Sequence, residues 1–587
     1  MLPPPLPPLE FKDLYKKIEY RIPMRDGVKL YTAVYVPRNA SKPFPIMMQR
    51  TPYSAGPYGT EKYRMSREDT PFVKAGYGFA FQDVRGRYMS EGVWENVRPI
   101  GRDKTDDSTD CYDTVDFLVK NVKGNNGRLG LRGISYPGFY AGAGAINNHP
   151  ALKAVSPQAP VTDWFMGDDV YHRDAFFVQD NWGFSEWFDV PRKGLEEEHA
   201  GLPEYDHGPG GPYGFYLRMV NSNGLETGIA KGRIPYWKEI MEHDTYDAYW
   251  KERALQNKMR GIKCAVLTVG GLFDAEDMWG AIHLYQSTEA QNPGISNAFV
   301  YGPWSHGQWA DKGESLNGMA FGSDTSAWFQ KEIEFPFFEH HLRGRPDPKL
   351  AEATVFETGA NQWRRFASWP PKGLKAKAIY LAEGKKLAGT PPTKTGADGY
   401  ENDPARPTPY LANREEEDRP GGLLAQDEAW NAKRDDVLTY QGAPLAAPLR
   451  VAGPVDADVW VTTTGTDMDL VVKVVDVWPA GSPYAGQMRM VRSEVIRGRF
   501  RDSFSQPKPF VPGQPTRIRL RLNDVLHTFG KGHRMGVMIQ SSWFPLVDRN
   551  PNRFVNVHKA KASDYQKATI KVLRDPKHPS RILFGTL

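Results

Sequence analysis

Two contrasting patterns along the chain constrain its fold more than any other feature of the sequence. Up to about residue 160, buried-strand patterns alternate with helical ones, as in FPIMMQR at 44–50, CYDTVDFLVKNV at 111–122 and RLGLRGIS at 128–135. Such β–α alternation is typical of a mostly parallel sheet covered by helices. From residue 347 onward, short alternating strands are separated by polar loops and long helices are missing. This second pattern predicts an antiparallel β-sandwich, expected to be a jelly roll.

The segments between and around these patterns complete the predicted domain organisation. Residues 1–161 form the first part of the parallel-sheet domain and begin with a proline-rich arm, 1–11, expected to be an extended polyproline II segment. Residues 162–257 crowd Trp, Tyr, Phe, Gly and Pro around helical stretches, which predicts an inserted helical cap. The strand pattern resumes in 258–346, and the all-β domain is expected to span 347–587.

Composition excludes several classes of protein. The 587 residues are 40% hydrophobic and 25% charged, with a mean hydropathy of -0.57, as in a soluble globular protein. The net charge is only +5, from 75 Lys and Arg against 70 Asp and Glu, which does not indicate a nucleic-acid partner. No stretch approaches the roughly 18 apolar residues of a membrane span. The N-terminus lacks the basic and apolar regions of a signal peptide, so none is expected in this chain.

The sequence Gly133-Ile134-Ser135-Tyr136-Pro137-Gly138 is the strongest candidate for catalytic chemistry. It follows an apolar strand and opens a helix rich in Gly and Ala, which is the setting of a nucleophile elbow. Small residues flank the serine because the turn is tight, and the turn presents the hydroxyl at the helix N-terminus. The spacing is G-x-S-x-x-G, so the pattern alone is weak, and an ordinary strand–helix turn is the alternative.

A serine nucleophile needs a base, and the base needs an orienting carboxylate. In α/β-hydrolases these residues follow the serine in the order acid, then histidine. Asp274 ends the strand-like run CAVLTVGGLFD, and His306 follows NAFVYGPW. Both are expected in loops at the carboxyl ends of parallel strands, where open α/β sheets place their sites. Of the 13 histidines, His306 alone combines this order with this kind of strand.

Four motifs together resemble a known family of serine hydrolases. GISYPG, QDVRGRYMSEG at 82–92, GGLFDAEDMWGA at 270–281 and GPWSHG at 302–307 are similar to those of the cocaine esterase and X-Pro dipeptidyl-peptidase group. Within that group the closest resemblance is to the α-amino acid ester hydrolases, and it covers the whole chain. It implies an α/β-hydrolase domain with an inserted helical cap and a C-terminal jelly roll.

The resemblance also implies roles for individual residues. Ser135 would be the nucleophile, Asp274 the orienting acid and His306 the general base. The oxyanion hole would consist of the Tyr53 phenol and the backbone N–H of Tyr136. Taken alone, Tyr53 would more often be a packed loop aromatic.

A cluster of three acids separates the subfamilies of this group. By the resemblance, Asp169, Glu276 and Asp277 would bind the ammonium group of the substrate, because three carboxylates near one pocket make it strongly negative. The alternative is that Glu276 and Asp277 cap the following helix, as acids often do. Two positions depart from the subfamily pattern: Phe273 and Ala275 stand where Trp and Gln are expected, which would reshape the pocket.

The predicted function is therefore that of a serine hydrolase that cleaves, and can transfer, the acyl group of α-amino acid esters and amides, including β-lactam antibiotics. Its partner is a small-molecule ester or amide; acyl transfer needs no cofactor, and the sequence shows no metal motif. A homo-oligomer held by the N-terminal arm is one expectation, and the resemblance suggests a periplasmic or secreted location. The alternatives are a cocaine-esterase-like or glutaryl-acylase-like enzyme without an α-amino requirement, an X-Pro dipeptidyl-peptidase, and a carbohydrate- or surface-binding protein with a dead hydrolase domain.

Overall fold

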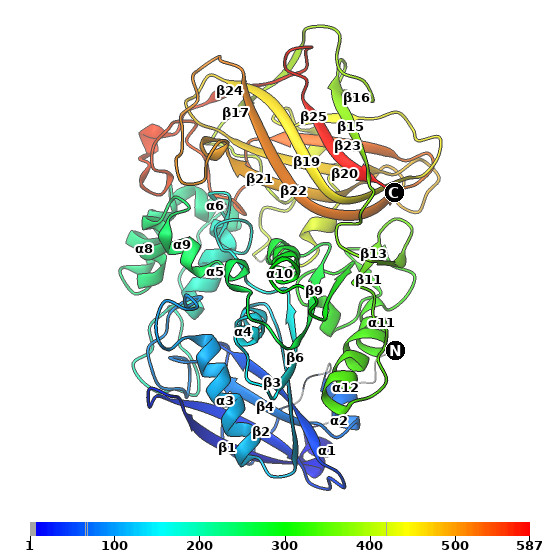
Figure 1. Ribbon diagram of the computed structural model, residues 1–587. Helices are drawn as coiled ribbons and strands as arrows, with labels where there is room; N and C mark the ends of the chain where they lie inside the picture. Colours follow the sequence, from blue (N-terminus) through cyan, green and yellow to red (C-terminus); the bar gives the residue numbers. More distant parts are fainter. Residues whose placement is uncertain (1–7, 65, 67–68, 418) are drawn as a thin grey trace.

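A ten-stranded sheet forms the base of the molecule (Figure 1). The computed structural model describes residues 8–64, 66, 69–417 and 419–587. Six neighbouring pairs, from the β3–β4 pair to the β10–β13 pair, are parallel, and only the edges are antiparallel. The prediction of a mostly parallel sheet is thus confirmed. In spatial order its strands are β1 (Tyr15–Pro23), β2 (Lys29–Pro37), β4 (Gly78–Asp83), β3 (Phe44–Thr51), β5 (Asn125–Ile134), β6 (Leu152–Gln158), β9 (Ala265–Gly271), β10 (Asn297–Gly302), β13 (Ala353–Glu357) and β14 (Gln362–Phe366).

The last two strands of this sheet come from the segment that was predicted to lie in the β-sandwich. β13 pairs in parallel with β10, and β14 pairs antiparallel with β13. Residues 353–366 therefore extend the first sheet beyond the predicted boundary at 346. Short alternating strands look the same at the edge of either sheet, and only the pairing partner distinguishes them.

Helices cover both faces of the sheet, and glycines at the contacts of β5 with two helices show how closely the helices approach. A Cβ at Gly130 would lie 2.9 Å from Phe338 and Leu342 of α12 (Phe335–Arg343). On the opposite face, a Cβ at Gly144 of α4 (Tyr136–Ala145) would lie 2.6 Å from Leu131. Because successive strand residues point to opposite faces, α12 and α4 pack on opposite faces of β5, the strand that leads into the candidate nucleophile.

The segment between β6 and β9 is helical and lies beside the sheet, between the lower and upper parts of the molecule (Figure 1). Its only strands among the described residues are the short hairpin β7 (Tyr171–His172) and β8 (Ala175–Phe176). The helices are α5 (Val178–Phe188), α6 (Gly211–Arg218), α7 (Ser222–Leu225), the π-helical turn Glu226–Ala230, α8 (Pro235–Glu242) and α9 (Ala248–Arg253). Another helix, α10 (Met278–Gln291), follows β9 and packs on β9 and β10.

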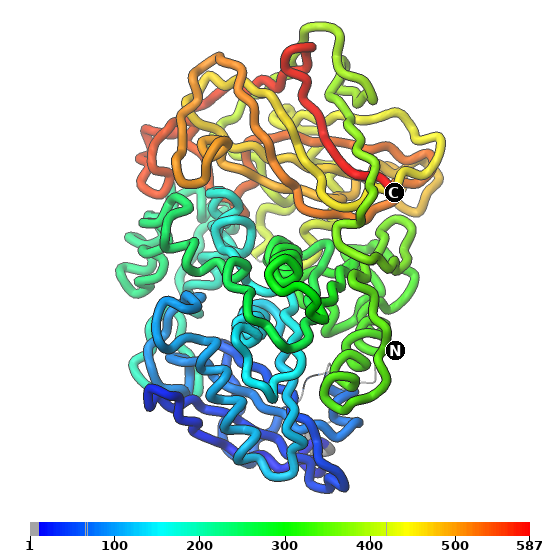
Figure 2. The backbone as a smooth tube through the Cα atoms, viewed as in Figure 1, coloured from blue at the N-terminus to red at the C-terminus, as the bar shows by residue number. Residues whose placement is uncertain are grey.

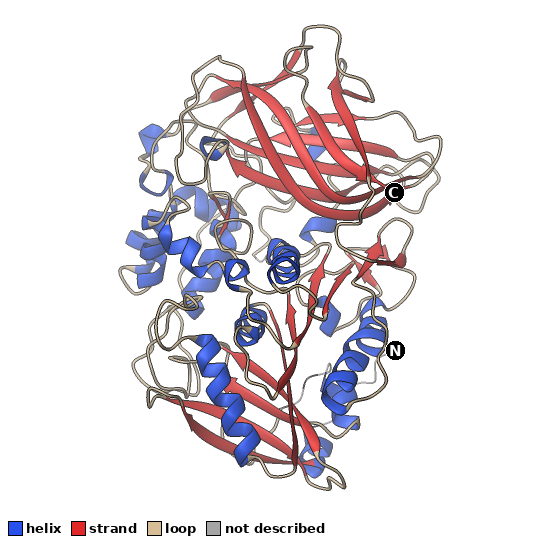
Figure 3. Cartoon of the chain, viewed as in Figure 1, coloured by secondary structure: helices blue, strands red, loops and turns tan. Residues whose placement is uncertain are grey.

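The C-terminal part is all-β, as predicted, and Figures 2 and 3 show it stacked above the sheet and the cap. Its eleven strands pair antiparallel except for the β16–β18 pair, which is parallel. Apolar residues of its inner faces, such as Val459, Val472 and Ile539, are fully buried together. The strands are β15 (Lys375–Ala382), β16 (Lys386–Ala388), β17 (Ala397–Asn402), β18 (Leu438–Gln441), β19 (Leu449–Thr463), β20 (Asp469–Val477), β21 (Met488–Arg497), β22 (Thr516–Phe529), β23 (Arg534–Gln540), β24 (Ala568–Leu573) and β25 (Arg581–Thr586).

The N-terminal arm differs from the prediction where the structure describes it. Residues 1–7 of the predicted polyproline segment lie outside the described residues. Pro8–Leu14 forms the short helix α1, because proline is tolerated in the first turn of a helix and Phe11 is buried against Tyr15 and Tyr35. Among the described residues, no helix is both long enough and apolar enough to cross a membrane.

Candidate active site

Ser135 occupies a strained turn between β5, which ends at Ile134, and α4, which begins at Tyr136. Its φ of 68° and ψ of -129° are unfavourable for a residue with a Cβ. The two flanking glycines are sterically required: a Cβ at Gly133 would lie 2.4 Å from the Pro137 carbonyl oxygen, and one at Gly138 would lie 2.6 Å from the Gln158 carbonyl oxygen. The predicted strand–serine–helix arrangement is therefore present, and it places the hydroxyl at the start of α4.

Asp274 and His306 meet at the carboxyl ends of β9 and β10. The Nδ1 atom of His306 lies 3.0 Å from Oδ2 of Asp274. The other oxygen of this buried carboxylate accepts hydrogen bonds from the backbone N–H groups of Glu276 (2.8 Å) and Asp277 (3.1 Å). Burial raises the pKa of Asp274, but His306 and these N–H donors outweigh burial and leave the pKa below its usual value. Asp274 therefore stays ionised and orients the imidazole.

The imidazole of His306 is surrounded by acids on both sides. Glu276 Oε2 lies 3.4 Å from Nε2, and Asp277 Oδ2 lies 3.8 Å from Nδ1. Burial alone would lower the pKa of His306, but Glu276 and Asp274 raise it to about 10. In the absence of a bound cation, the protonated imidazolium is thus the favoured form at neutral pH.

Tyr53 lies beside the candidate nucleophile and lines the same cavity as Ser135. Burial and neighbouring carboxylates raise the pKa of Tyr53 well above its usual value. The phenol therefore keeps its proton over the whole physiological range and can act as a hydrogen-bond donor. Its ring packs against Phe188 and Trp187 of the cap, with centroids 5.5 and 6.1 Å apart.

The group of Tyr136 that can donate a hydrogen bond near Ser135 is its backbone N–H and not its side-chain hydroxyl. Its hydroxyl accepts a hydrogen bond from the Val97 N–H (2.7 Å) and donates to Asn96 Oδ1 (2.9 Å), so the side chain is fixed away from the serine. Its amide belongs to the first residue of α4, and the first amides of a helix have no acceptor within that helix. This N–H is therefore free to face a developing oxyanion near Ser135.

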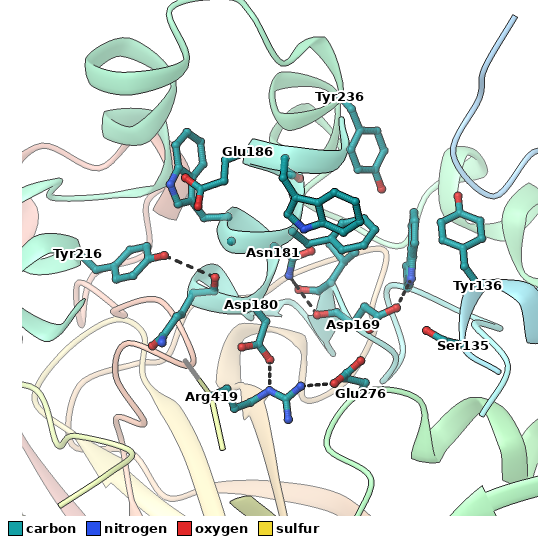
Figure 4. A pocket seen from close by; sticks show the side chains of 18 of the residues that line it. Ser135, Tyr136, Asp169, Asp180, Asn181, Glu186, Tyr216, Tyr236, Glu276 and Arg419 are labelled. Carbon is teal, nitrogen blue, oxygen red and sulfur yellow. Dashed lines mark hydrogen bonds and ion pairs between the residues drawn. The ribbon is translucent and has the colours of Figure 1, made fainter. Parts of the chain in front are cut away.

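A cavity of about 450 Å³ opens at Ser135 and extends under the cap. A volume of this size suits a small organic substrate. Three parts of the chain line it, and Figure 4 shows how their polar groups converge. The hydrolase domain contributes Tyr53, Ser135, Tyr136 and Glu276; the cap contributes Trp164, Asp169, Asp180, Trp187, Tyr205 and Tyr236, among others; and the C-terminal part contributes Glu417 and Arg419.

Two of the three predicted ammonium-binding acids line this cavity. Asp169 accepts a hydrogen bond from Trp164 Nε1 at 2.9 Å, and burial together with the charge of Glu276 raises its pKa to about 7. Glu276 forms an ion pair with Arg419 through Oε1. Near neutral pH the cavity therefore presents carboxylate charge close to Ser135.

Asp277, the third acid, is buried behind the cavity and does not line it. Both of its carboxylate oxygens are buried, and neither has a hydrogen-bond partner among the described residues. Burial and the nearby carboxylates, Asp169 foremost, raise its pKa well above the usual value and so favour the protonated form. Any effect of Asp277 on a substrate cation is consequently indirect.

The backbone amides in the first turn of α10 are capped by the side chain of Asp168 and not by that of Asp277. Asp277 occupies the N-cap position, but its side chain makes no capping hydrogen bond. Asp168, the neighbour of Asp169, accepts instead from the Gly280 N–H at 2.7 Å and also binds two backbone amides of its own loop. Of the two adjacent aspartates, one supports the fold and the other faces the cavity.

The two departures from the subfamily pattern do not line this cavity. Phe273 and Ala275 are buried in the apolar core between the sheet and the C-terminal domain, and neither lines the cavity. Sequence reasoning also missed Arg419 and Asp180, which form an ion pair at the cavity wall. Arg419 lies in the charged run 414–419, and no motif distinguishes it from the other charged residues there.

A strained serine between a strand and a helix, a histidine paired to a buried aspartate and a sheet of this topology define the class of α/β-hydrolase-type serine hydrolases. Residues 26–308 match the X-Pro dipeptidyl-peptidase (S15) family, and residues 348–583 match the X-Pro dipeptidyl-peptidase C-terminal non-catalytic domain. The chain belongs to this S15 family, the cocaine esterase group, and is a serine ester hydrolase.

Three relatives span nearly the whole chain. Cocaine esterase of Rhodococcus sp. (strain MB1 Bresler) is 26% identical over 96% of this chain and 97% of its own length. The crystal structure of an aminopeptidase from a marine sediment Thaumarchaeota archaeon is 36% identical, with a TM-score of 0.92 over 98% of this chain and 96% of that one. The structure of an α-amino acid ester hydrolase is also 36% identical, with a TM-score of 0.91 over 98% and 97%.

Proposed function

We propose that this enzyme hydrolyses esters, and some amides, of α-amino acids through an acyl-enzyme on Ser135. The observation that carries the proposal is the position of Asp169 and Glu276, which line the same cavity as the serine. A carboxylate pair at this place suits the α-ammonium group of a substrate whose carbonyl faces Ser135. The names of the two solved relatives, an aminopeptidase and an α-amino acid ester hydrolase, describe substrates with that group.

The proposed reaction has two halves. Ser135 Oγ attacks the carbonyl carbon while His306 Nε2 takes the hydroxyl proton, and the Tyr53 phenol and the Tyr136 N–H stabilise the oxyanion. Collapse of the tetrahedral intermediate breaks the bond to the leaving group, which receives the proton from His306. Water then repeats the sequence on the acyl-enzyme and frees the amino acid. An amine in place of that water, such as a β-lactam nucleus, would receive the acyl group instead.

Glu276→Gln tests the requirement for the α-amino group. This change keeps the size of the side chain and removes its charge. We expect KM for phenylglycine methyl ester to rise about 10- to 100-fold, because a hydrogen bond to a charged group contributes about 1.5–3 kcal/mol. Hydrolysis of the deaminated analogue, phenylacetic acid methyl ester, should be retained or improved. Steady-state kinetics on the two esters measure the difference.

Asp277→Asn serves as the matched comparison, since Asp277 is buried and does not line the cavity. It should raise KM for the amino ester much less than Glu276→Gln does. Equal losses on the charged and the neutral ester in Glu276→Gln would refute an ammonium site. The cocaine-esterase-like alternative, without an α-amino requirement, would then be the better account.

The pKa of His306 predicts different pH profiles for the two esters. A general base acts only when deprotonated, so kcat/KM for the neutral ester should rise about tenfold per pH unit until His306 loses its proton near pH 10. An α-amino ester loses its own charge above an amine pKa of about 8. Its kcat/KM should therefore level off above that pH while the neutral ester continues to gain. Profiles recorded from pH 6 to 10.5 that coincide for both esters would contradict this assignment.

A further inference from the structure

Arg419 reaches the cavity from a long loop of the C-terminal part of the chain. Its side chain is only 10% exposed, and its Nε donates to Asp180 Oδ2 at 2.5 Å while Nη2 pairs with Glu276 (Figure 4). The loop is tied down on both sides of Arg419. Gln179 Nε2 donates to the Glu417 carbonyl oxygen at 3.2 Å, and Arg489 Nη1 donates to the Ala425 carbonyl oxygen at 3.1 Å.

Glu276 stands between this guanidinium and the histidine of the site. Its Oε1 pairs with Arg419, whereas Oε2 lies 3.4 Å from Nε2 of His306. Because Nδ1 of His306 is held by Asp274, Nε2 is the nitrogen left to accept the Ser135 proton. In the proposed mechanism, Glu276 therefore lies beside the nitrogen that has to accept the Ser135 proton.

We propose that Arg419 is a positioning residue: by pairing with Glu276 it prevents that carboxylate from closing on Nε2 of His306, and so leaves Nε2 available to Ser135. The inference rests on the proposed role of His306 as the general base. It also gives the C-terminal part of the chain, described in the family as non-catalytic, a direct contact with the reaction site.

The charges around Arg419 explain why this pairing holds Glu276 in place. Arginine keeps its charge at every accessible pH, and its planar group can bind two carboxylates at once. Burial raises the pKa of Asp180, while the Arg419 guanidinium opposes that rise and favours the ion pair. Asp180 in this way fixes the guanidinium from the cap side, and Glu276 is drawn toward it.

Without Arg419, Glu276 would be a poorly compensated carboxylate beside an imidazole. His306 already faces Asp274 and Asp277 on its Nδ1 side, Glu276 on its Nε2 side and Asp169 nearby. Shortening this 3.4 Å contact between Glu276 and Nε2 would stabilise the imidazolium further, and an imidazolium cannot accept the serine proton. Each additional unit of pKa lowers the deprotonated fraction tenfold below that pKa.

A double-mutant experiment tests this role on a neutral substrate. Arg419→Met keeps a long side chain and removes the charge. For p-nitrophenyl acetate at pH 8, we expect kcat/KM to fall about tenfold or more, with the rising limb of the pH profile displaced by about one unit to higher pH. Adding Glu276→Gln removes the competing carboxylate, so Arg419→Met/Glu276→Gln should recover at least the wild-type rate and move the limb to lower pH.

Controls separate positioning from a loss of structure. Arg414 lies on the same loop and stacks on Tyr213 at 4.8 Å, away from the cavity, so Arg414→Met should leave the pH profile unchanged. A double variant as slow as Arg419→Met alone, or an unshifted limb in Arg419→Met, would overturn the proposal. If Arg419→Met does not fold, Arg419→Lys provides the test, because a single ammonium group cannot hold both carboxylates as well as a guanidinium does. This variant should displace the rising limb of the pH profile in the same direction as Arg419→Met, but by less.

This test is independent of the proposed preference for amino acids. Since p-nitrophenyl acetate carries no ammonium group, rescue by Glu276→Gln can be scored whether or not α-amino esters are the preferred substrates. Failure of the rescue with a retained preference for the amino ester would reject only the role of Arg419. Successful rescue without such a preference would reject only the proposed substrate class.

Discussion

Ser135→Ala should reduce kcat on every ester by about four to six orders of magnitude and abolish labelling by a fluorophosphonate probe. The hydroxyl is the atom that would carry the acyl group, and neither the oxyanion donors nor the acids can replace it. Folding should be preserved, because alanine is smaller than serine and meets the same backbone conformation, with φ of 68°, at a comparable cost. Single-turnover kinetics, probe labelling and thermal unfolding together measure these effects.

Two further variants make this result specific. His306→Ala should cost nearly as much activity as Ser135→Ala, because residues that act as a unit are not additive. Ser222 also forms a close pair with a histidine, His558, at 2.5 Å, but the other ring nitrogen of that buried imidazole pairs with the Tyr171 hydroxyl and not with a carboxylate of the described residues, and burial lowers its pKa to about 3. Ser222→Ala should therefore leave labelling intact. Substantial turnover in Ser135→Ala would refute the nucleophile assignment.

Tyr53→Phe should lower kcat by about 10²–10³, a smaller loss than removal of the serine or of the histidine. The change deletes one hydroxyl and keeps the ring, so the packing against Phe188 and Trp187 is retained. An oxyanion-hole donor contributes about 2.7–4 kcal/mol to the transition state, and KM should change much less than kcat. Steady-state kinetics on a neutral ester isolate this loss, since no ammonium contact is involved.

Tyr58→Phe is the matched control for that variant. Tyr58 lies on the same loop, and its hydroxyl donates to the buried Asp83 at 2.9 Å rather than facing Ser135. Its loss should lower the free energy of unfolding and leave kcat nearly unchanged. If Tyr53→Phe resembled Tyr58→Phe, the phenol would serve packing and the second oxyanion donor would be another group.

Local chain properties made the hydrolase fold and the candidate triad predictable. The strand, the small residues and the helix around Ser135 are adjacent in the sequence, and their turn leaves no space for larger side chains at Gly133 and Gly138. Asp274 and His306 follow buried strands, and parallel strands bring their carboxyl ends to one edge. Glu276 was expected near the site only through the family resemblance, since from the residues alone a helix cap was the favoured interpretation.

The local sequence pattern could not predict the direction in which a side chain points or which distant residues pair. Asp168 and Asp169 are neighbours, yet one supports α10 and the other faces the cavity. Similarly, Asp277 adjoins Glu276 but is buried beside His306 and does not line the cavity. Adjacent residues point in different directions, so a step of one position along the chain can change whether a carboxyl group is buried. Burial in turn shifts the pKa of that group.

The sequence alone thus determined the class of fold and pointed to the candidate serine, acid and histidine, because these depend on periodicity and on residues that directly follow strands, whereas the acid cluster was indicated only by the family resemblance. Only the tertiary structure decided that β13 and β14 complete the first sheet and that Arg419, 143 residues after Glu276, pairs with it at the cavity wall. Such contacts form when whole domains pack together. Their energies depend on which groups lose water at the interface, and no local pattern in the chain encodes that outcome.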